Sequence, residues 1–258
     1  MNKHDWNPDL YLKFDKERIL PTVDLVGRID CENPKDIIDI GCGPGNSTQI
    51  LFNRWPDSNI VGADKSPAMI KKASDDYPDQ KWILYDASHD NIDNKFDIVF
   101  SNATIQWIPN HKKLIKRFAD LLIDKGILAV QLPLFLDMPI GKSITEIAKQ
   151  NRWKSVTRGV DDLFEINSAS YYYNQLSPYF SHINIWITDY FHVMDSHLSI
   201  LEMMRSTGLK PYKERINETI YREEFEKQVL ESIKRDYPLQ NNGKVIFPFK
   251  RLFFVAKK

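Results

Sequence analysis

Apolar and polar residues in the first half of the chain form two alternating kinds of pattern. One is a short run of mostly apolar residues, which is typical of a strand buried inside a sheet. The other is an amphipathic stretch that begins with capping residues, which indicates a helix. Strands that alternate with helices predict an α/β fold with a mainly parallel sheet. The predicted strands are 37–40, 59–64, 81–85, 96–100 and 127–132, and helices are predicted from about 46 to 54, from 67, and from about 112 to 123.

The second half of the chain has a different pattern. Residues 182–193 alternate polar and apolar side chains, which predicts a half-exposed antiparallel strand. Two helices are expected at about 196–206 and 218–236, and a long strand or bent pair of strands at 245–256. Residues 133 to about 173 are predicted to be irregular to helical, as an insertion into the α/β pattern.

The N-terminal 36 residues are predicted to be mostly helical. Asn7-Pro8 opens a helix that carries Tyr11, and Pro21 is expected to end or restart it because an internal proline removes a backbone hydrogen bond. Most of this region is interpreted as two amphipathic helices outside the sheet. Its aromatic-rich start, with Arg18, is interpreted as a lid over a ligand.

The stretch from Ile37 to Asn46 carries the main chemical signal and reads I-I-D-I-G-C-G-P-G-N. Gly41, Gly43 and Gly45 let the backbone turn tightly and approach a ligand closely. Dinucleotide-binding folds carry G-x-G-x-x-G, whereas the spacing here is G-x-G-x-G with Asp39 just before it. An acid in that place would repel a pyrophosphate and would suit a ligand with ammonium and sulfonium charges. The alternative is an ordinary strand, turn and helix.

Polar residues follow the glycine loop and the next strand. Residues 46–48 offer side-chain oxygens that are expected to cap a helix. Asp64 ends the second strand about twenty residues later, where a carboxylate can accept hydrogen bonds from both ribose hydroxyls. Ser66 is expected to cap the following helix, with Pro67 at its first position and Met69 beside the acid.

Residues 101–107 follow the strand at 96–100. Ligands of open parallel sheets bind beyond the carboxyl ends of the strands, so these residues are predicted to lie where two substrates meet. Gln106 would supply a hydrogen-bond donor and Trp107 a flat wall, although packing in the core explains Trp107 equally well. His111 is interpreted as a surface residue at a helix start rather than as a base.

Composition limits the partners. The chain has 258 residues, and its 42% apolar content supports a sizeable core in one large domain, with or without a cap. Lys+Arg and Asp+Glu are both 35, so no basic field would hold nucleic acid or an anionic membrane. Cys31 and Cys42 are too few for a disulfide framework, and no secretion signal or apolar membrane span is found. A cytoplasmic protein is expected.

The combination of D-I-G-C-G-P-G at 39–45 with D-K-S-P-A-M at 64–69 resembles the class I methyltransferases, which use S-adenosylmethionine and release S-adenosylhomocysteine. This resemblance implies a Rossmann-like α/β fold: a seven-stranded mixed sheet with helices on both faces and a small helical cap. It also implies that Asp86 receives the adenine amino group, although a solvated turn residue is the alternative. The implied cofactor-binding residues are Asp39, Gly41, Gly43, Gly45, Asp64, Lys65, Met69, Asp86, Ala87 and Asn102.

A closer resemblance, to the trans-aconitate 2-methyltransferase family, covers nearly the whole chain. It implies a single domain over 1–258, with a lid at 1–30, a cofactor-binding core at 31–133 and cap insertions at 134–180 and 194–238. Met203 and Lys250 depart from the family, which carries tryptophan and proline there, so the exact acid is less firmly implied than the reaction. The matching stretches are D-W-N-P-D-L-Y-L at 5–12, D-I-G-C-G-P-G-N-S-T at 39–48, S-P-A-M at 66–69, N-A-T-I-Q-W at 102–107, L-A-V-Q-L-P at 128–133, S-H-L-S-I at 196–200, T-G-L-K-P at 207–211, Y-P-L-Q-N-N-G at 237–243 and R-L-F-F-V-A at 251–256.

The implied product is a monomethyl ester of trans-aconitate, a small polycarboxylate. A carboxylate with a pKa near 4 is already ionised at pH 7, so it needs no general base. No catalytic residue and no metal site are therefore predicted; Gln106 and His192 are candidates for positioning only. Arginines suit the carboxylates that do not react, and neutral donors suit the reacting one. The candidate substrate-binding residues are Tyr11, Arg18, Gln106, Trp107, His192 and Arg251, with Arg205 as a further nearby arginine.

Other readings stay open at this point. Carboxyl O-methyltransferases that act on malonyl-acyl-carrier protein share the S-N-x-x-x-Q-W stretch, but should offer a basic patch for an acidic carrier. Another small acid is a further alternative. A non-enzymatic regulator that binds S-adenosylmethionine would need no acceptor pocket, and the predicted cap argues against it. The sequence does not indicate an oligomeric state.

Overall fold

The computed structural model describes the backbone of residues 15–258 and the side chains from residue 19 onward. The predicted helix start at Asn7-Pro8 and the candidate Tyr11 lie outside the described residues. Arg18 falls within a described helix, but its side chain lies outside the description. The chain divides into two compact units, the first made of residues up to 132, 165–187 and 252–258, and the second of 133–164 and 188–251.

The expected seven-stranded mixed sheet is confirmed, with strand order β3-β2-β1-β4-β5-β7-β6. Strands β1 to β5 pair in parallel with their neighbours. The central β1 is buried almost throughout, as its run of isoleucines predicts. The strands are β1 Asp36–Ile40, β2 Asn59–Asp64, β3 Lys81–Leu84, β4 Phe96–Asn102, β5 Leu122–Pro133, β6 His182–Met194 and β7 Val245–Lys257.

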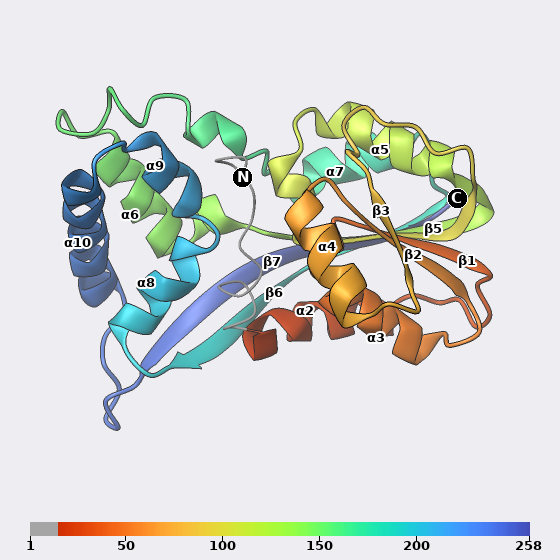
Figure 1. Cartoon of the computed structure of the whole chain (residues 1–258), viewed down its shortest axis with the longest axis horizontal. Coiled ribbons are helices and arrows are strands. Elements are labelled where there is room, and N and C mark those ends of the chain that lie inside the picture. The colour runs from red at the N-terminus through yellow and green to blue at the C-terminus, as the bar shows by residue number, and fades with distance from the viewer. Residues whose placement is uncertain (1–14) are drawn as a thin grey trace. The chain divides into compact units, whose positions relative to one another are not determined.

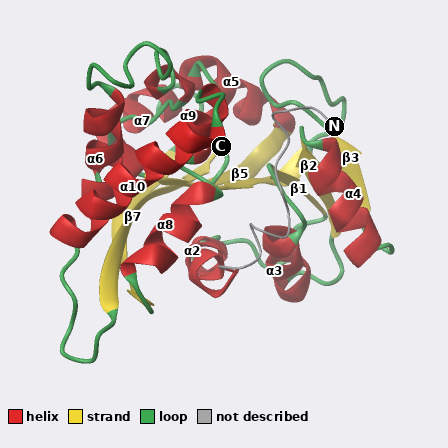
Figure 2. Cartoon of the chain, turned by 60° about the vertical axis from the view of Figure 1, so that its left-hand side comes forward, coloured by secondary structure: helices red, strands yellow, loops and turns green. Residues whose placement is uncertain are grey.

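Helices of the first unit cover both faces of its sheet. Helices α2 and α3 lie together on one face, and α5 and α7 on the other (Figure 1). Figure 2 shows the same two layers from another side. The central strands β1 and β4 are therefore buried from both faces, which is how an α/β sheet is stabilised. These helices are α2 Asp15–Gly27, α3 Asn46–Arg54, α4 Pro67–Asp76, the 3₁₀ turn η1 Ile105–Trp107, α5 His111–Leu121 and α7 Ala169–Leu176.

Two boundaries differ from the sequence prediction. Pro21 neither ends nor restarts a helix but lies inside the continuous α2, where the burial of Leu25 and Val26 offsets the lost backbone hydrogen bond. Strand β5 begins at Leu122 rather than at Ile127, directly after α5. The sequence D-K-G at 124–126 is typical of a turn and hid this strand start, where residues 123–125 are exposed.

The second unit is mostly helical. Trp153 packs edge-on against Phe225, with ring centroids 5.3 Å apart, and its indole nitrogen donates to Gln228. The Tyr237 hydroxyl accepts from the Ile140 backbone, 3.0 Å away, and so joins α10 to α6. The short helix α9 had no strong sequence signal. The elements are η2 Phe135–Asp137, α6 Pro139–Ala148, η3 Asp161–Leu163, α8 His197–Arg205, α9 Lys210–Arg215 and α10 Thr219–Asp236.

Among residues 15–258, none of the helices combines the length and the apolar character that crossing a membrane requires.

Candidate functional site

The glycine loop joins β1 to α3 through three residues with positive φ: Gly41 at 80°, Gly43 at 55° and Gly45 at 101°. At two of these glycines, a neighbouring side chain occupies the space that a Cβ would need. A Cβ on Gly41 would lie 2.0 Å from Thr104 Oγ1, and one on Gly45 would lie 2.8 Å from the Trp82 ring. Among the described residues nothing lies within 4 Å of a Cβ on Gly43, so this part of the chain leaves the middle of the loop open toward a ligand.

Asp39 lies beneath this loop and is fully buried. Its Oδ2 accepts hydrogen bonds from Ser47 Oγ at 2.6 Å and Thr48 Oγ1 at 2.7 Å. These hydroxyls were expected to cap α3; instead the N-cap is Gly45 without a side-chain bond, because the hydroxyls turn toward the buried carboxylate. Asp39 Oδ1 has no hydrogen-bond partner among the described residues.

Burial disfavours the ionised form of the Asp39 carboxyl. Burial raises the pKa of this carboxyl to about 6, with a smaller rise from nearby Asp64, and the bonds from Ser47 and Thr48 oppose both. The carboxylate is ionised at pH 7 with one oxygen unsatisfied. A positively charged ligand group would compensate for this cost.

Asp64 ends β2 beside the glycine loop. Its two carboxylate oxygens accept from Gly43 N at 2.9 Å and Ser66 N at 2.8 Å. Ser66 caps α4 through Met69 N at 3.2 Å, as predicted, and Met69 is buried under the loop between β2 and α4. Lys65, in contrast, is exposed. A carboxylate oxygen has more than one lone pair, so a backbone N–H and a ligand hydroxyl can share it.

Asp86 follows β3 and is held in a tight turn. Ser88 donates to its Oδ1 from both Oγ, at 2.6 Å, and the backbone, at 2.9 Å. Burial acts to raise its pKa, but these hydrogen bonds outweigh it, and the pKa of Asp86 is lowered. The Arg117 guanidinium on α5 binds the next carbonyl, Ala87 O, at 3.0 Å. An ionised acceptor is therefore fixed at the end of β3.

Residues 102–107 follow β4 next to the glycine loop. Thr104 Oγ1 donates toward Gly41 O at 3.2 Å, which ties the two loops together. Ala103 has φ of 53°, and Gln106 Nε2 donates to its carbonyl at 2.7 Å. The expected donor Gln106 thus uses one N–H within the loop, and its Oε1, like Asn102 Oδ1, is buried without a partner among the described residues.

The position of the His111 side chain differs from the sequence prediction. His111 does begin a helix, α5, but its side chain is fully buried rather than on the surface. Its Nε2 lies 2.8 Å from Ile105 O and its Nδ1 2.8 Å from the Tyr172 hydroxyl. Helix-start position alone could not show this, since both ring partners come from other segments.

The predicted cofactor-binding residues therefore gather at the carboxyl ends of β1, β2, β3 and β4, which are neighbours in the sheet. The loop is open at Gly43, two carboxylates face it, and Asp39 lacks a partner on one oxygen. These features fit a ligand that has a positively charged group and hydroxyls. In residues 15–258 no group of three side chains is placed to hold a metal ion.

The predicted substrate-binding residues of the second unit form an aromatic cluster. His192 on β6 is buried, and its ring lies parallel to that of Tyr190 and 6.0 Å from that of Phe249. The Arg251 guanidinium lies over the Phe249 ring, 4.4 Å from its centroid. The sequence analysis missed Tyr190 and Phe249, although their alternation with His192 and Arg251 along the two strands places each pair on one face.

The charge state of His192 follows from this cluster. Burial, with a contribution from the positive charge of Arg251, lowers the pKa of His192 to about 4. The imidazole is therefore neutral at pH 6 to 8, and its Nε2 has no hydrogen-bond partner among the described residues. The guanidinium of Arg205 forms a bidentate ion pair with the Glu226 carboxylate, with N–O distances of 2.7 and 3.2 Å.

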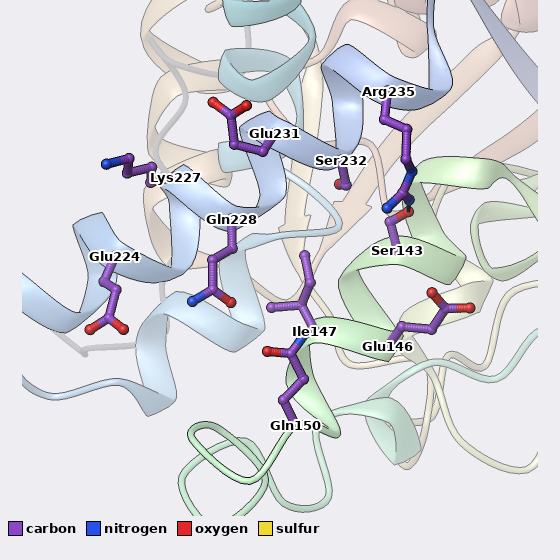
Figure 3. Close-up of a pocket in the computed structure, with 10 residues that line it drawn as sticks. All are labelled: Ser143, Glu146, Ile147, Gln150, Glu224, Lys227, Gln228, Glu231, Ser232 and Arg235. Carbon is purple, nitrogen blue, oxygen red and sulfur yellow. Dashed lines mark hydrogen bonds between the residues drawn. The ribbon is translucent and has the colours of Figure 1, made fainter.

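A groove of about 490 Å³ lies between α6 and α10 in the second unit (Figure 3). Three of its charged lining residues form ion pairs with residues outside the lining: Glu224 with Arg152, Glu231 with Lys234, and Arg235 with Asp236. The groove contains none of the predicted site residues.

Comparison with known proteins defines the class. A family model described as a methyltransferase domain matches residues 38–130. The crystal structure of YcgJ from Bacillus subtilis matches with a TM-score of 0.61 at 15% identity, over 92% of this chain and 98% of that one. Phosphoethanolamine N-methyltransferase 2 of Haemonchus contortus, solved with S-adenosyl-L-methionine, matches with a TM-score of 0.60 at 16% identity, over 97% and 56%. The fold is that of the class I methyltransferases.

Sequence relatives narrow this class. Trans-aconitate 2-methyltransferase of Escherichia coli O139:H28 is 38% identical over 254 residues, 98% of both chains. The protein of the same name from Shigella flexneri is 37% identical over the same length. The chain belongs to the trans-aconitate 2-methyltransferase family.

Replacing Gly41 by alanine is expected to lower the free energy of unfolding by about 3 kcal/mol, since a left-handed backbone costs roughly 1–2 kcal/mol and overpacking a similar amount. Gly43→Ala is the matched control: it has the same backbone strain without the contact to Thr104. It should lose only about 1–2 kcal/mol. Urea unfolding of both variants checks this, and equal losses would contradict the close approach of Thr104.

The raised pKa of Asp39 predicts a pH dependence of stability. Between roughly pH 4 and 6 the folded protein binds this proton more tightly than the unfolded chain, so the contribution of Asp39 to stability is lost as pH rises through about 6. Asp39→Asn lacks this loss. Relative to the natural protein, the variant should gain about 2.4 kcal/mol between pH 4 and pH 7, because the pKa of Asp39 is raised from 3.8 to about 6. Urea unfolding at several pH values measures the difference, and a difference independent of pH would disprove it.

Proposed function

We propose that the protein is an S-adenosylmethionine-dependent carboxyl O-methyltransferase that forms the monomethyl ester of trans-aconitate. The observation that carries this proposal is the 38% identity to trans-aconitate 2-methyltransferase over 98% of both chains. The chemistry of the two groups of residues supports it. The first unit offers acids and an open glycine loop, and the second offers a buried arginine and a neutral histidine.

In this proposal the first unit binds the cofactor. S-adenosylmethionine supplies a methyl group on a positively charged sulfur. Asp39, ionised and buried, would balance the positive charge of the ligand, while Asp64 would accept from its ribose hydroxyls. Asp86 would accept from the adenine amino group, for which its lowered pKa keeps it ionised. Gly43 would let the backbone approach the ligand.

Within the second unit, His192 and Arg251 are proposed to bind the acceptor. Arg251 is a cation held on an aromatic ring, which suits a carboxylate that does not react. His192 is neutral, so it would position the reacting carboxylate without drawing charge from it. Because that carboxylate is already ionised, the residues would act by alignment and by excluding water rather than as a base.

The proposed partner is thus a small polycarboxylate rather than a macromolecule. The cytoplasm is the proposed location, because Cys31 and Cys42 are both free thiols, as is usual in a reducing compartment.

The acceptor is tested with a panel of acids. The protein with S-adenosylmethionine and trans-aconitate should give a product heavier by one methyl group, detected by mass spectrometry, with an equal amount of S-adenosylhomocysteine. Parallel reactions contain cis-aconitate, isocitrate, citrate and a malonyl-carrier protein. Esterification of the carrier alone would replace this proposal by the carrier-protein reading, and esterification of a different acid would change the substrate.

His192→Gln tests the chemistry of the acceptor. Glutamine keeps a neutral donor of similar reach, so KM for the acid should rise roughly 5- to 10-fold while kcat stays within about threefold, as for lost uniform binding. His182→Gln, on the exposed start of β6, is the matched control and should behave as the natural protein. A fall in kcat of about 10²–10⁴-fold, the contribution of a general base, would mean that the acceptor must lose a proton. With both substrates saturating, kcat of the natural protein should also show no change from His192 between pH 6 and 8, since the pKa of His192 is about 4.

A further inference from the structure

The turn at Ile105–Trp107 depends on contacts from outside its own segment. It carries Gln106 and Trp107, which are proposed to serve the acceptor. Within the segment it has one short turn of backbone hydrogen bonds, such as Ile108 N to Ile105 O at 2.9 Å. A turn of this length is not stable by itself, so its conformation must be set by neighbouring residues.

His111 holds this turn through Ile105. A carbonyl oxygen can only accept, so the imidazole nitrogen that lies 2.8 Å from Ile105 O must carry the proton. The other nitrogen then accepts from the Tyr172 hydroxyl at 2.8 Å. Two directed hydrogen bonds therefore run from Tyr172 through His111 to the turn.

Glu165 holds the next residue of the same turn. Its backbone N–H donates to Gln106 O at 3.0 Å. Its carboxylate accepts from the backbone of Asn110 and of His111, the latter at 2.9 Å, at the N-terminus of α5. A carboxylate is favoured at that end of a helix. Two successive carbonyls of the turn are thus bound by groups that α5 and the segment before α7 bring together.

Packing alone does not account for this arrangement. Burying an imidazole costs free energy unless both nitrogens are bonded, whereas an apolar ring would fill the same space without that cost. His111 is fully buried, and both of its nitrogens are bonded to groups outside α5. The hydrogen bonds therefore serve the conformation of the turn.

We propose that His111 is a positioning residue: it fixes the Ile105–Trp107 turn in the conformation that receives the acceptor, and the Tyr172 hydroxyl holds the imidazole through its other nitrogen. This inference rests on the proposed function for the meaning of the turn, but not for its geometry. Neither residue is proposed to touch the substrate.

Tyr172→Phe and His111→Phe remove the chain of hydrogen bonds while keeping ring-shaped side chains. Tyr173→Phe is the matched control, since it makes the same chemical change on an exposed neighbour in α7. Amide hydrogen exchange of residues 105–108 should become roughly 10-fold faster in the first two variants and stay unchanged in the third, because local opening sets this rate. Nitrogen NMR of the natural protein should show His111 protonated at Nε2.

Kinetics then test the link to the acceptor. In His111→Phe, KM for trans-aconitate should rise about 10-fold, with Kd for S-adenosylmethionine within about twofold, as expected when only acceptor binding is affected. His111→Gln can still donate to Ile105 O and should recover most of the loss. A merely structural residue would instead lower the active fraction and leave KM unchanged.

The outcomes separate this inference from the proposed function. Unchanged exchange in both ring variants, or an unchanged KM in His111→Phe while the natural protein is active, would overturn the positioning role alone. A natural protein that esterifies none of the acids would overturn the proposed function and the acceptor part of this inference with it. If His111→Phe does not fold, Tyr172→Phe, which keeps the buried ring, decides the question by the same measurements.

Discussion

The buried carboxylate of Asp39 is the constraint on which the first unit depends. It accepts from Ser47 and Thr48, and so joins the end of β1 to the start of α3 across the glycine loop. Because the two hydroxyls bind Asp39, they do not cap α3. The loop is a turn of glycines with positive φ, and the N-cap of α3 is Gly45 without a side-chain hydrogen bond. The arrangement leaves a buried negative charge with one oxygen unpartnered among the described residues. Such a charge destabilises the protein by itself, and the proposed cationic ligand would balance it.

The other loops of the first unit are arranged around this one. Thr104 contacts Gly41 so closely that a side chain there has no room, and Asp64 binds the backbone of Gly43. Each loop end is therefore held by a hydrogen bond to a neighbouring loop rather than by its own secondary structure. Helix α5 contributes at two points, through Arg117 to Ala87 O and through His111 to Ile105 O. The site is preorganised by this network, which is what alignment without a general base requires.

The second unit supplies a different kind of chemistry. Its aromatic rings bury His192 and carry Arg251, so that one side chain is kept neutral and the other remains a cation. In the proposed reaction a polycarboxylate would use both, because a cation would bind a carboxylate that does not react and a neutral donor would leave the reacting one nucleophilic. Arg205 lies near a family motif in the sequence, but its guanidinium forms an ion pair with Glu226. Closeness to a motif therefore does not by itself identify a substrate-binding arginine.

The sequence by itself determined which strands, helices and loops follow one another along the chain. Isoleucine-rich runs predicted the buried strands, and the glycine spacing predicted the loop. The positions of Asp64 and Asp86 at strand ends made them candidate cofactor-binding residues. All of these signals are local in the sequence. Tertiary structure decided what depends on partners distant in the chain. It turned Ser47 and Thr48 toward Asp39, kept α2 continuous through Pro21, and buried His111 between Ile105 and Tyr172. In each case a contact made only in the folded chain outweighed the local preference of the residue.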